Sequence, residues 1–278
     1  MRESVSVEPP VHPAQRPAAP QVVRFRATGF APAPRGATSW LVFAIVLAAW
    51  QAAGSLGLVN ALFLPSPLAI VRALWRLAAS GELWAHVSIS LLRIGAGWII
   101  GTAVGVAVGL AVGLFSLARA AGLPIVSALF PIPKIALLPL LILWLGIGET
   151  SKIATIALGV FFPTVIAVYS GVDQVPRNLI RMAQSFELPF LGIVRKVVLP
   201  GALPNIVAGF RISASIALLL VVAAEMIGAE AGIGAFVLQA GNLMQTDQLM
   251  AGVVVLSILG LAVARGIGAL EARVTRWR

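Results

Sequence analysis

Residues 174–205 read QVPRNLIRMAQSFELPFLGIVRKVVLPGALPN, a polar and basic stretch between two long apolar ones. Apolar residues in its first half recur at the spacing of one helix face: Leu179, Met182, Ala183 and Phe186. Pro189 restricts the residue before it and restarts the chain, so a second short amphipathic helix is predicted over 190–197. Two such helices at one membrane face are suited to binding a partner.

The composition around this stretch is that of an integral membrane protein. Of the 278 residues, 59% are hydrophobic and 11% are charged, whereas soluble domains carry about 25% charged residues. The chain contains no Cys, which excludes disulfides and Cys-ligated metals. Residues 1–38 differ, because they hold seven prolines and five arginines and no apolar run, so a disordered tail is predicted there. Residues 39–278 are predicted to form one membrane domain with its core at 85–272.

Six stretches are long and apolar enough to cross a bilayer. They are 40–57, 94–115, 125–145, 153–172, 206–228 and 249–270. With the N-terminus inside, the cytoplasmic segments hold thirteen Lys and Arg residues and the outer segments four. This bias predicts that both termini and the 174–205 stretch are cytoplasmic. The net charge of +10 is therefore assigned to topology, and no nucleic-acid partner is expected.

An additional helix is predicted in the first outer loop, capped by Ser66 with Pro67 in its first turn and ended by Gly81. Its apolar face would consist of Val71, Leu74, Trp75 and Ala78, and its polar face of Arg72 and Arg76. The pattern leaves open whether this helix lies flat on the membrane or packs on the bundle.

Small and helix-breaking residues mark two of the spans. Glycines at four-residue spacing in the second span predict close approach by another helix, either within the chain or at a sliding or dimer surface: Gly97, Gly101, Gly105, Gly109 and Gly113. The third span carries Lys134 beside Pro131 and Pro133. An intramembrane Lys indicates either a kinked helix lining the translocation path or a Lys paired with backbone carbonyls in a structural kink, and both interpretations remain open. Glu225 is a further candidate for the path.

The chain carries no recognisable catalytic set. Its two His residues lie in the tail and the first outer loop, and no nucleophile elbow, metal-ligand spacing or phosphate-binding P-loop occurs. We therefore expect a transport subunit rather than an enzyme, with no metal, no catalytic residue and no cofactor on this chain. If ATP drives transport, another polypeptide binds it.

The 174–205 stretch resembles the signature loop of the permease subunits of bacterial ATP-binding-cassette (ABC) importers. That pattern reads Glu-Ala-Ala, three residues, Gly, nine residues, Ile-x-Leu-Pro. With Leu199 and Pro200 as the anchor, Ala183 fits, whereas Arg181 and Met182 depart from the pattern and Glu187 stands at its Gly position. The resemblance implies a coupling helix that docks on the ATPase. The implied coupling residues are Leu179, Arg181, Met182, Ala183, Gln184, Ser185, Phe186, Glu187, Leu199 and Pro200.

Further segments extend the resemblance over residues 60–278, among them PIPKIALLPLLILWLGIGETSKI and AAEMIGAEAGIG. They are similar to the nitrate/sulfonate/taurine/bicarbonate branch of these permeases. The resemblance implies an all-α type I importer permease in the bacterial inner membrane. Its implied partners are an ABC ATPase, a second permease copy that forms a homodimer, an extracytoplasmic solute-binding protein and the lipid bilayer. The expected solute is a small oxyanion. Neutral or cationic vitamin precursors, and an ion-coupled secondary transporter, are the alternatives.

Overall fold

The computed structural model describes residues 36–274, and these residues form helices and connecting turns without a strand. The chain divides into two units, residues 1–47 and residues 48–278. Helix α1 (Gly36–Ser55) begins in the first unit, and its segment from Thr38 is long and apolar enough to span a membrane. It starts three residues before the predicted boundary at residue 39. The rest of the predicted tail, residues 1–35, lies outside the described residues.

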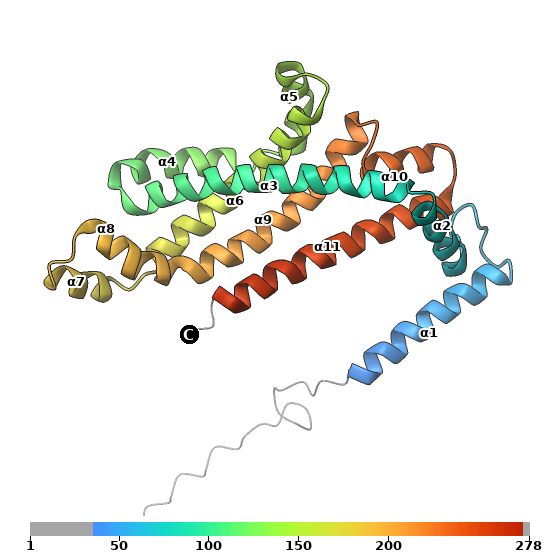
Figure 1. Ribbon diagram of the computed structural model, residues 1–278, viewed down its shortest axis with the longest axis horizontal. Coiled ribbons are helices and arrows are strands. Elements are labelled where there is room, and N and C mark those ends of the chain that lie inside the picture. Colours follow the sequence, from blue (N-terminus) through green and yellow to red (C-terminus); the bar gives the residue numbers. More distant parts are fainter. Residues whose placement is uncertain (1–35, 275–278) are drawn as a thin grey trace, which may run out of the picture. The chain divides into compact units, whose positions relative to one another are not determined.

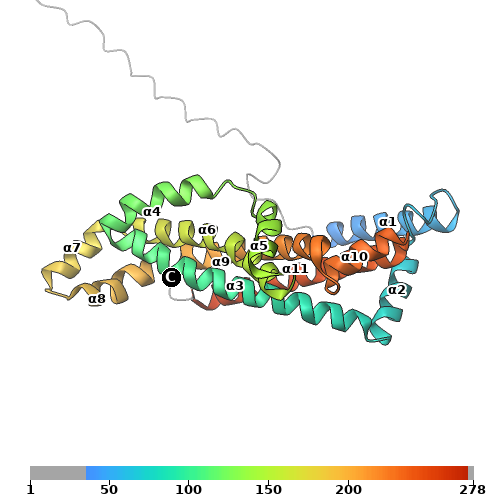
Figure 2. The same ribbon diagram turned by 90° about the horizontal axis from the view of Figure 1, so that it is seen from above.

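Three long helices form the centre of the second unit: α3 (Glu82–Leu114), α6 (Glu149–Asp173) and α9 (Leu199–Gly228). They pack side by side, with α6 in contact with both α3 and α9 (Figures 1 and 2). Helix α11 (Thr246–Val274) lies against α9, α10 (Ile233–Asn242) and α2 (Pro67–Ala79). The all-helical class predicted from the sequence is confirmed.

The glycines of α3 form its contact with α6. A Cβ built on Gly97 would lie 2.6 Å from Ile156, one on Gly105 2.8 Å from Thr164, and one on Gly109 2.7 Å from Val168. Backbone approach this close requires glycine. The glycine stripe is thus an intramolecular seam, as one of the two interpretations had it. Because residue numbers rise together along both helices, α3 and α6 run parallel.

The third predicted span is two helices. Helix α4 (Ser116–Leu129) is followed by a 3-10 turn (η1, Lys134–Leu137) and α5 (Leu138–Leu145), and the pair is bent by 88°. Since α3 and α6 are parallel, this bent pair must return the chain from the end of α3 to the start of α6. Five described helices are long and apolar enough to span a membrane, and there are six if the bent pair is one span.

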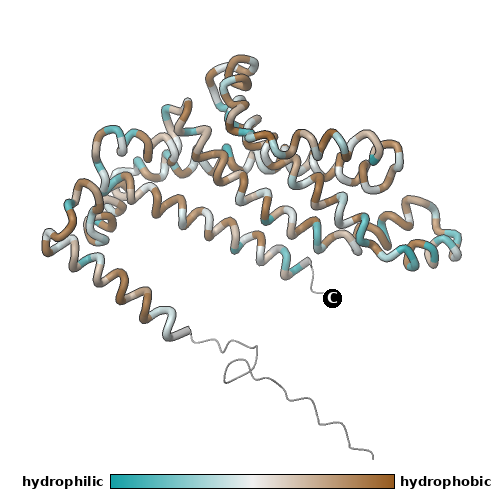
Figure 3. The backbone as a smooth tube through the Cα atoms, turned by 180° about the vertical axis from the view of Figure 1, so that it is seen from behind, coloured by the Kyte–Doolittle hydropathy of each residue, from teal (hydrophilic) through white to brown (hydrophobic). Residues whose placement is uncertain are grey.

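The two ends of the central helices differ in what they carry. We call them the α7 end, where α7 (Arg177–Ser185) connects α6 to α9, and the α10 end, where α10 connects α9 to α11. Helix α11 runs antiparallel to α9, because Arg211 in α9 pairs at 3.6 Å with Glu271 near the end of α11, whereas Leu218, further along α9, lies 3.8 Å from a Cβ built on the earlier Gly260. Hydrophilic residues gather on α7 (Figure 3).

Helix α2 packs on the bundle through a face that the sequence did not predict. Ser66 accepts a hydrogen bond from the Ala69 N–H, Pro67 is the first helical residue and Gly81 follows the end with φ 84°, as predicted. The buried residues are Ile70, Ala73 and Leu77, which pack against Phe236 and Ala251. Of the predicted apolar face, Val71 and Trp75 point outward and are 59% and 76% exposed. Leu74 and Ala78 are partly buried, and Leu74 packs against the same cluster. Both faces of α2 are apolar, so periodicity alone could not choose between them.

Candidate functional site: helix α7 and the ion-paired α10 end

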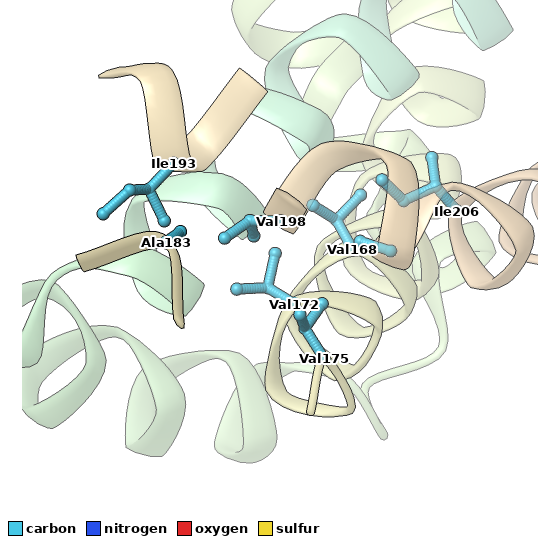
Figure 4. Close-up of a cluster of buried hydrophobic side chains, with 8 residues drawn as sticks. Val168, Val172, Val175, Ala183, Ile193, Val198 and Ile206 are labelled. Carbon is cyan, nitrogen blue, oxygen red and sulfur yellow. The ribbon is translucent and has the colours of Figure 1, made fainter. Parts of the chain in front are cut away.

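The short helix predicted at 179–186 is present as α7, and one side of it is built into the bundle. Ala183 is 3% exposed and lies in an apolar cluster with Val175, Ile193 and Val198 (Figure 4). Val175 follows the end of α6, and Ile193 and Val198 precede α9 in the chain. The cluster therefore fixes α7 to both long helices that flank it, as apolar burial does elsewhere in folded proteins.

The turn that ends α7 uses a left-handed residue. Glu187 has φ 54°, its N–H donates to Gln184 O at 2.9 Å, and the Leu188 N–H donates to Ala183 O at 3.2 Å. These two bonds are those of a Schellman C-cap, in which the left-handed position is ordinarily glycine. Glu187 is the residue aligned with the Gly of the signature pattern. The departure at this position changes the side chain, whereas the backbone keeps the conformation that glycine favours.

The other three residues of the predicted stripe lie on the same face of α7 as Ala183 but are exposed. Leu179 is 40% exposed, Met182 54% and Phe186 74%. Polar side chains surround them, since Arg181, Gln184 and Ser185 are also exposed. Three of the four residues of the predicted stripe thus form an accessible surface, which we call the α7 stripe (Leu179, Met182 and Phe186). Ala183, the fourth, belongs to the internal cluster.

The second predicted short helix is the beginning of a longer one. Residues Phe190–Ile193 form α8, residues Val194–Val198 form one π-helical segment (η2), and α9 follows directly. The whole run Phe190–Gly228 is one apolar helical stretch. Leu199 and Pro200 lie in the first turn of α9 and are partly buried. Pro200 has no N–H to donate, and it lies just after the π-helical segment, where the regular hydrogen-bond ladder is already interrupted.

Lys134 binds backbone at the bend between α4 and α5. Its Nζ donates to Leu129 O at 2.8 Å, Phe130 O at 2.9 Å and Ile132 O at 2.6 Å, and it lies 4.5 Å from the centre of the Phe162 ring. An ammonium has three donors, and all three have an acceptor. Pro131 and Pro133 lie in the break itself. This geometry favours the structural-kink interpretation; the translocation-path assignment for these three residues stays a prediction.

Glu225 is buried in an ion-paired network at the α10 end. Its side chain accepts hydrogen bonds from Ser90 Oγ at 2.8 Å and from the Gly234 N–H at 2.8 Å, and its Oε1 lies 2.8 Å from Arg93 Nη1. The Ser90 hydroxyl also accepts from the Ile233 N–H at 2.9 Å. Glu225 and Ser90 thereby cap the first N–H groups of α10. The negative charge of the Glu225 carboxylate also interacts favourably with the positive N-terminal end of this helix.

Arg93 joins this network to α6. Its Nε and Nη2 donate to the two carboxylate oxygens of Glu149 at 2.6 and 2.5 Å, and its Nη1 donates to Ala231 O at 2.6 Å. Sequence reasoning counted Arg93 among the outer-loop charges and missed this role. A signal existed, because Arg93 is four residues before Gly97 and so continues the register of the buried glycine face. The function of Glu225 in a translocation path stays a prediction.

No group of His, Asp or Glu residues in the described part of the chain is arranged to hold a metal ion. The arrangement instead supplies an accessible apolar stripe at one end of the bundle and a charged, internally paired cluster at the other. One unbroken helix, α6, joins them, since it begins at Glu149 and ends at Asp173 beside the cluster that holds α7.

Known proteins are similar to this chain in sequence, and others are similar to it in fold. The family described as the binding-protein-dependent transport system inner membrane component matches residues 99–276. A putative aliphatic sulfonates transport permease of Escherichia coli is 40% identical over 238 residues, which are 86% of this chain and 90% of that protein. The corresponding protein of Bacillus subtilis is 37% identical over 86% of both chains. The taurine transport system permease of Escherichia coli is 37% identical over 84% of this chain and 87% of its own.

Among solved structures, the inward-facing methionine ABC transporter MetNI has the same fold, with a TM-score of 0.60 at 23% identity over 76% of this chain and 99% of that one. The chain therefore belongs to the inner-membrane components of binding-protein-dependent transport systems. It is a multi-pass permease subunit of an ABC importer. The resemblance stated from the sequence is confirmed.

Proposed function

We propose that this permease carries a sulfonate, either an aliphatic sulfonate or an aminosulfonate such as taurine, across the inner membrane. The observation that carries the solute class is the similarity to three permeases named for aliphatic sulfonates or taurine, at 37–40% identity over most of each chain. Nitrate, bicarbonate and the vitamin precursors are less well supported, because none of these three relatives is named for them.

The α7 end faces the cytoplasm in this proposal and the α10 end faces outward, as the Lys and Arg bias predicts. A separate ABC ATPase binds the α7 stripe, hydrolyses ATP and drives the cycle. A second copy of this chain completes the path, and an external binding protein delivers the solute. The support for the docking surface is the exposure of Leu179, Met182 and Phe186 on a helix that the buried Ala183 fixes to the bundle.

Uptake in cells tests the proposal. Cells lacking their own sulfonate importers would express this permease with its cognate ATPase and binding protein, and uptake of radiolabelled taurine and ethanesulfonate would be measured. We expect ATP-dependent uptake of at least one of them, with unlabelled sulfonate competing and nitrate or thiamine precursors not competing. Uptake of a vitamin precursor without any sulfonate uptake would contradict the assignment of the solute.

A further inference from the structure

A cavity of about 520 Å³ opens beside the ion-paired network at the α10 end. Four parts of the chain form it: the start of α3, the turn before α6, the first turn of α6 and the turn after α9. Its polar lining consists of Arg93, Gly148, Glu149, Lys152, Glu230 and Ala231. All of them lie in the unit of residues 48–278, so the cavity is part of one folded body.

Two buried cations line this cavity. Arg93 is 2% exposed and Lys152 is 5% exposed. A buried charge is stable only when partners compensate for its lost hydration. The guanidinium nitrogens of Arg93 donate hydrogen bonds to Glu149, Glu225 and the carbonyl oxygen of Ala231. Lys152 Nζ donates to Gly148 O at 2.9 Å, and no second acceptor among the described residues lies within hydrogen-bonding distance of it. An ammonium has three donors, so Lys152 retains unused hydrogen-bonding capacity next to the cavity.

The two carboxylates bound to Arg93 differ in how firmly they are held. The Glu225 side chain is fully buried and also caps α10, so its replacement would open that helix end. The Glu149 side chain is 53% exposed, and within the described residues Arg93 is its hydrogen-bonding partner. It follows Gly146, which has φ 85°, and Gly148 in the turn before α6. Glu149 can therefore leave Arg93 by rotating its side chain toward solvent.

A sulfonate can take the place of the Glu149 carboxylate. The guanidinium donates from Nε and Nη2 to two oxygens of one carboxylate, and this parallel pair of bonds suits any planar or tetrahedral oxyanion with two oxygens at similar spacing. A sulfonate has a third oxygen for the ammonium of Lys152. With Glu149 in place, two cations face three carboxylates, namely Glu149, Glu225 and Glu230. Displacement of Glu149 removes the excess negative charge that would repel an anion.

We propose that Arg93 and Lys152 form an oxyanion-binding site within the permease, which Glu149 occupies in this structure and which a transported sulfonate takes over by displacing it. The proposal rests on the proposed function for the identity of the solute, whereas the site itself requires only an oxyanion. Glu149 acts as an internal competitor, so the site binds an anion only when the solute is concentrated beside it. Delivery by a binding protein at this end would supply that concentration.

Equilibrium binding to the purified permease–ATPase complex, without binding protein, tests the site. The probes are radiolabelled ethanesulfonate and inorganic sulfate. Glu149→Gln removes the competing charge and leaves Arg93 in place, so we expect binding at least about tenfold tighter than wild type, roughly the value of one charge-assisted hydrogen bond. Lys152→Met in the Glu149→Gln background should reverse the gain by a similar factor.

Glu230→Gln is the matched control, because it removes the same charge from the cavity wall without freeing Arg93, so its gain should be smaller. If Glu149→Gln does not yield folded complex, Glu149→Asp keeps the charge but shortens the reach to Arg93, and an intermediate gain is expected. Equal affinities of the Glu149→Gln and Glu230→Gln variants, or no loss on adding Lys152→Met, would overturn the site.

The same experiment separates the site from the proposed function. Cells that take up ethanesulfonate while the Glu149 and Lys152 variants bind both probes like wild type would retain the function and lose the site. Cells that take up no sulfonate, combined with the expected variant pattern for sulfate binding, would retain the oxyanion site and lose sulfonate as the solute.

Discussion

Glu187 and Met244 adopt the left-handed backbone conformation, with φ 54° and 56°, although neither is glycine. Each follows the end of a short helix, at a turn that leads the chain back into the bundle. The Met244 N–H donates to Gly241 O at 3.0 Å and the Gln245 N–H to Ala240 O at 2.8 Å, the same pair of bonds that Glu187 and Leu188 make after α7. A non-glycine residue in this conformation costs about 1–2 kcal/mol. The bundle therefore accepts local strain at the turns on both of its ends.

Glu187→Gly should relieve this strain at α7. We expect the free energy of unfolding to rise by about 1 kcal/mol, less than the full strain because glycine has more freedom to lose on folding. Thermal unfolding of the purified permease in detergent measures the change. Gln184→Gly, inside α7, is the control and should lower stability by about 1 kcal/mol. A lower thermal unfolding midpoint for Glu187→Gly than for the wild type would show that the Glu187 side chain stabilises the fold by more than its left-handed backbone destabilises it.

Replacement of Lys134 distinguishes a role in the structural kink from a place in the translocation path, the two interpretations that the sequence left open. Lys134→Met removes the donor to three carbonyls at the bend, so the free energy of unfolding should fall by about 1–3 kcal/mol. Thermal unfolding and sulfonate uptake would be measured on the same variant. Exposed Lys196, replaced by Met, is the control for loss of a positive charge and should leave stability unchanged. Unchanged stability with lost uptake in Lys134→Met would instead support a place in the translocation path.

At the scale of elements, the parallel pair of α3 and α6 determines the course of the chain. Glycines on α3 allow the close contact, and the parallel direction forces α4 and α5 to cross back between them. The cluster around Ala183 then joins α7 to α6 and α9. Helix α6 is continuous from the polar network at Glu149 to Asp173 at the α7 end.

Gly97→Ala and Gly95→Ala form a matched pair on α3. A Cβ at Gly97 would lie 2.6 Å from Ile156, whereas a Cβ at Gly95 meets nothing within 4 Å. We expect Gly97→Ala to cost about 1–3 kcal/mol through overpacking, and Gly95→Ala to be neutral or to stabilise by up to about 1 kcal/mol. Thermal unfolding of both variants is the measurement. Similar midpoints would contradict the seam.

Truncation of the α7 stripe should weaken the complex with the ATPase. Phe186→Ala and Leu179→Ala each remove a large apolar side chain worth about 1.5–3 kcal/mol when buried, so each should weaken association by at least about tenfold. Binding of the purified ATPase to permease in nanodiscs measures this. Leu243→Ala is the control, because Leu243 is 58% exposed at the α10 end. Equal affinity in the stripe variants and the control would remove the docking assignment.

At the scale of the whole molecule, the sequence predicted what periodicity and composition determine. Most of the spans, the short helix at 179–186 and the capped helix after Ser66 follow from apolar spacing and cap residues. The bend at Pro131 and Pro133 could not be predicted as 88°, because prolines locate a break without setting its angle. The buried face of α2 and the pairing of Arg93 with Glu149 and Glu225 depend on contacts between segments far apart in the sequence.

The central claim is that α7 lies on the cytoplasmic side of the membrane, where the ATPase binds it. Because the chain has no cysteine, single cysteines at Gln184 on α7 and at Gln245 at the α10 end can be labelled without background. Both positions are exposed. We predict that a membrane-impermeant maleimide labels Gln245→Cys in intact cells and Gln184→Cys only in inside-out vesicles, and that bound ATPase protects Gln184→Cys. Labelling of Gln184→Cys from outside intact cells, or equal labelling with and without the ATPase, would contradict the account.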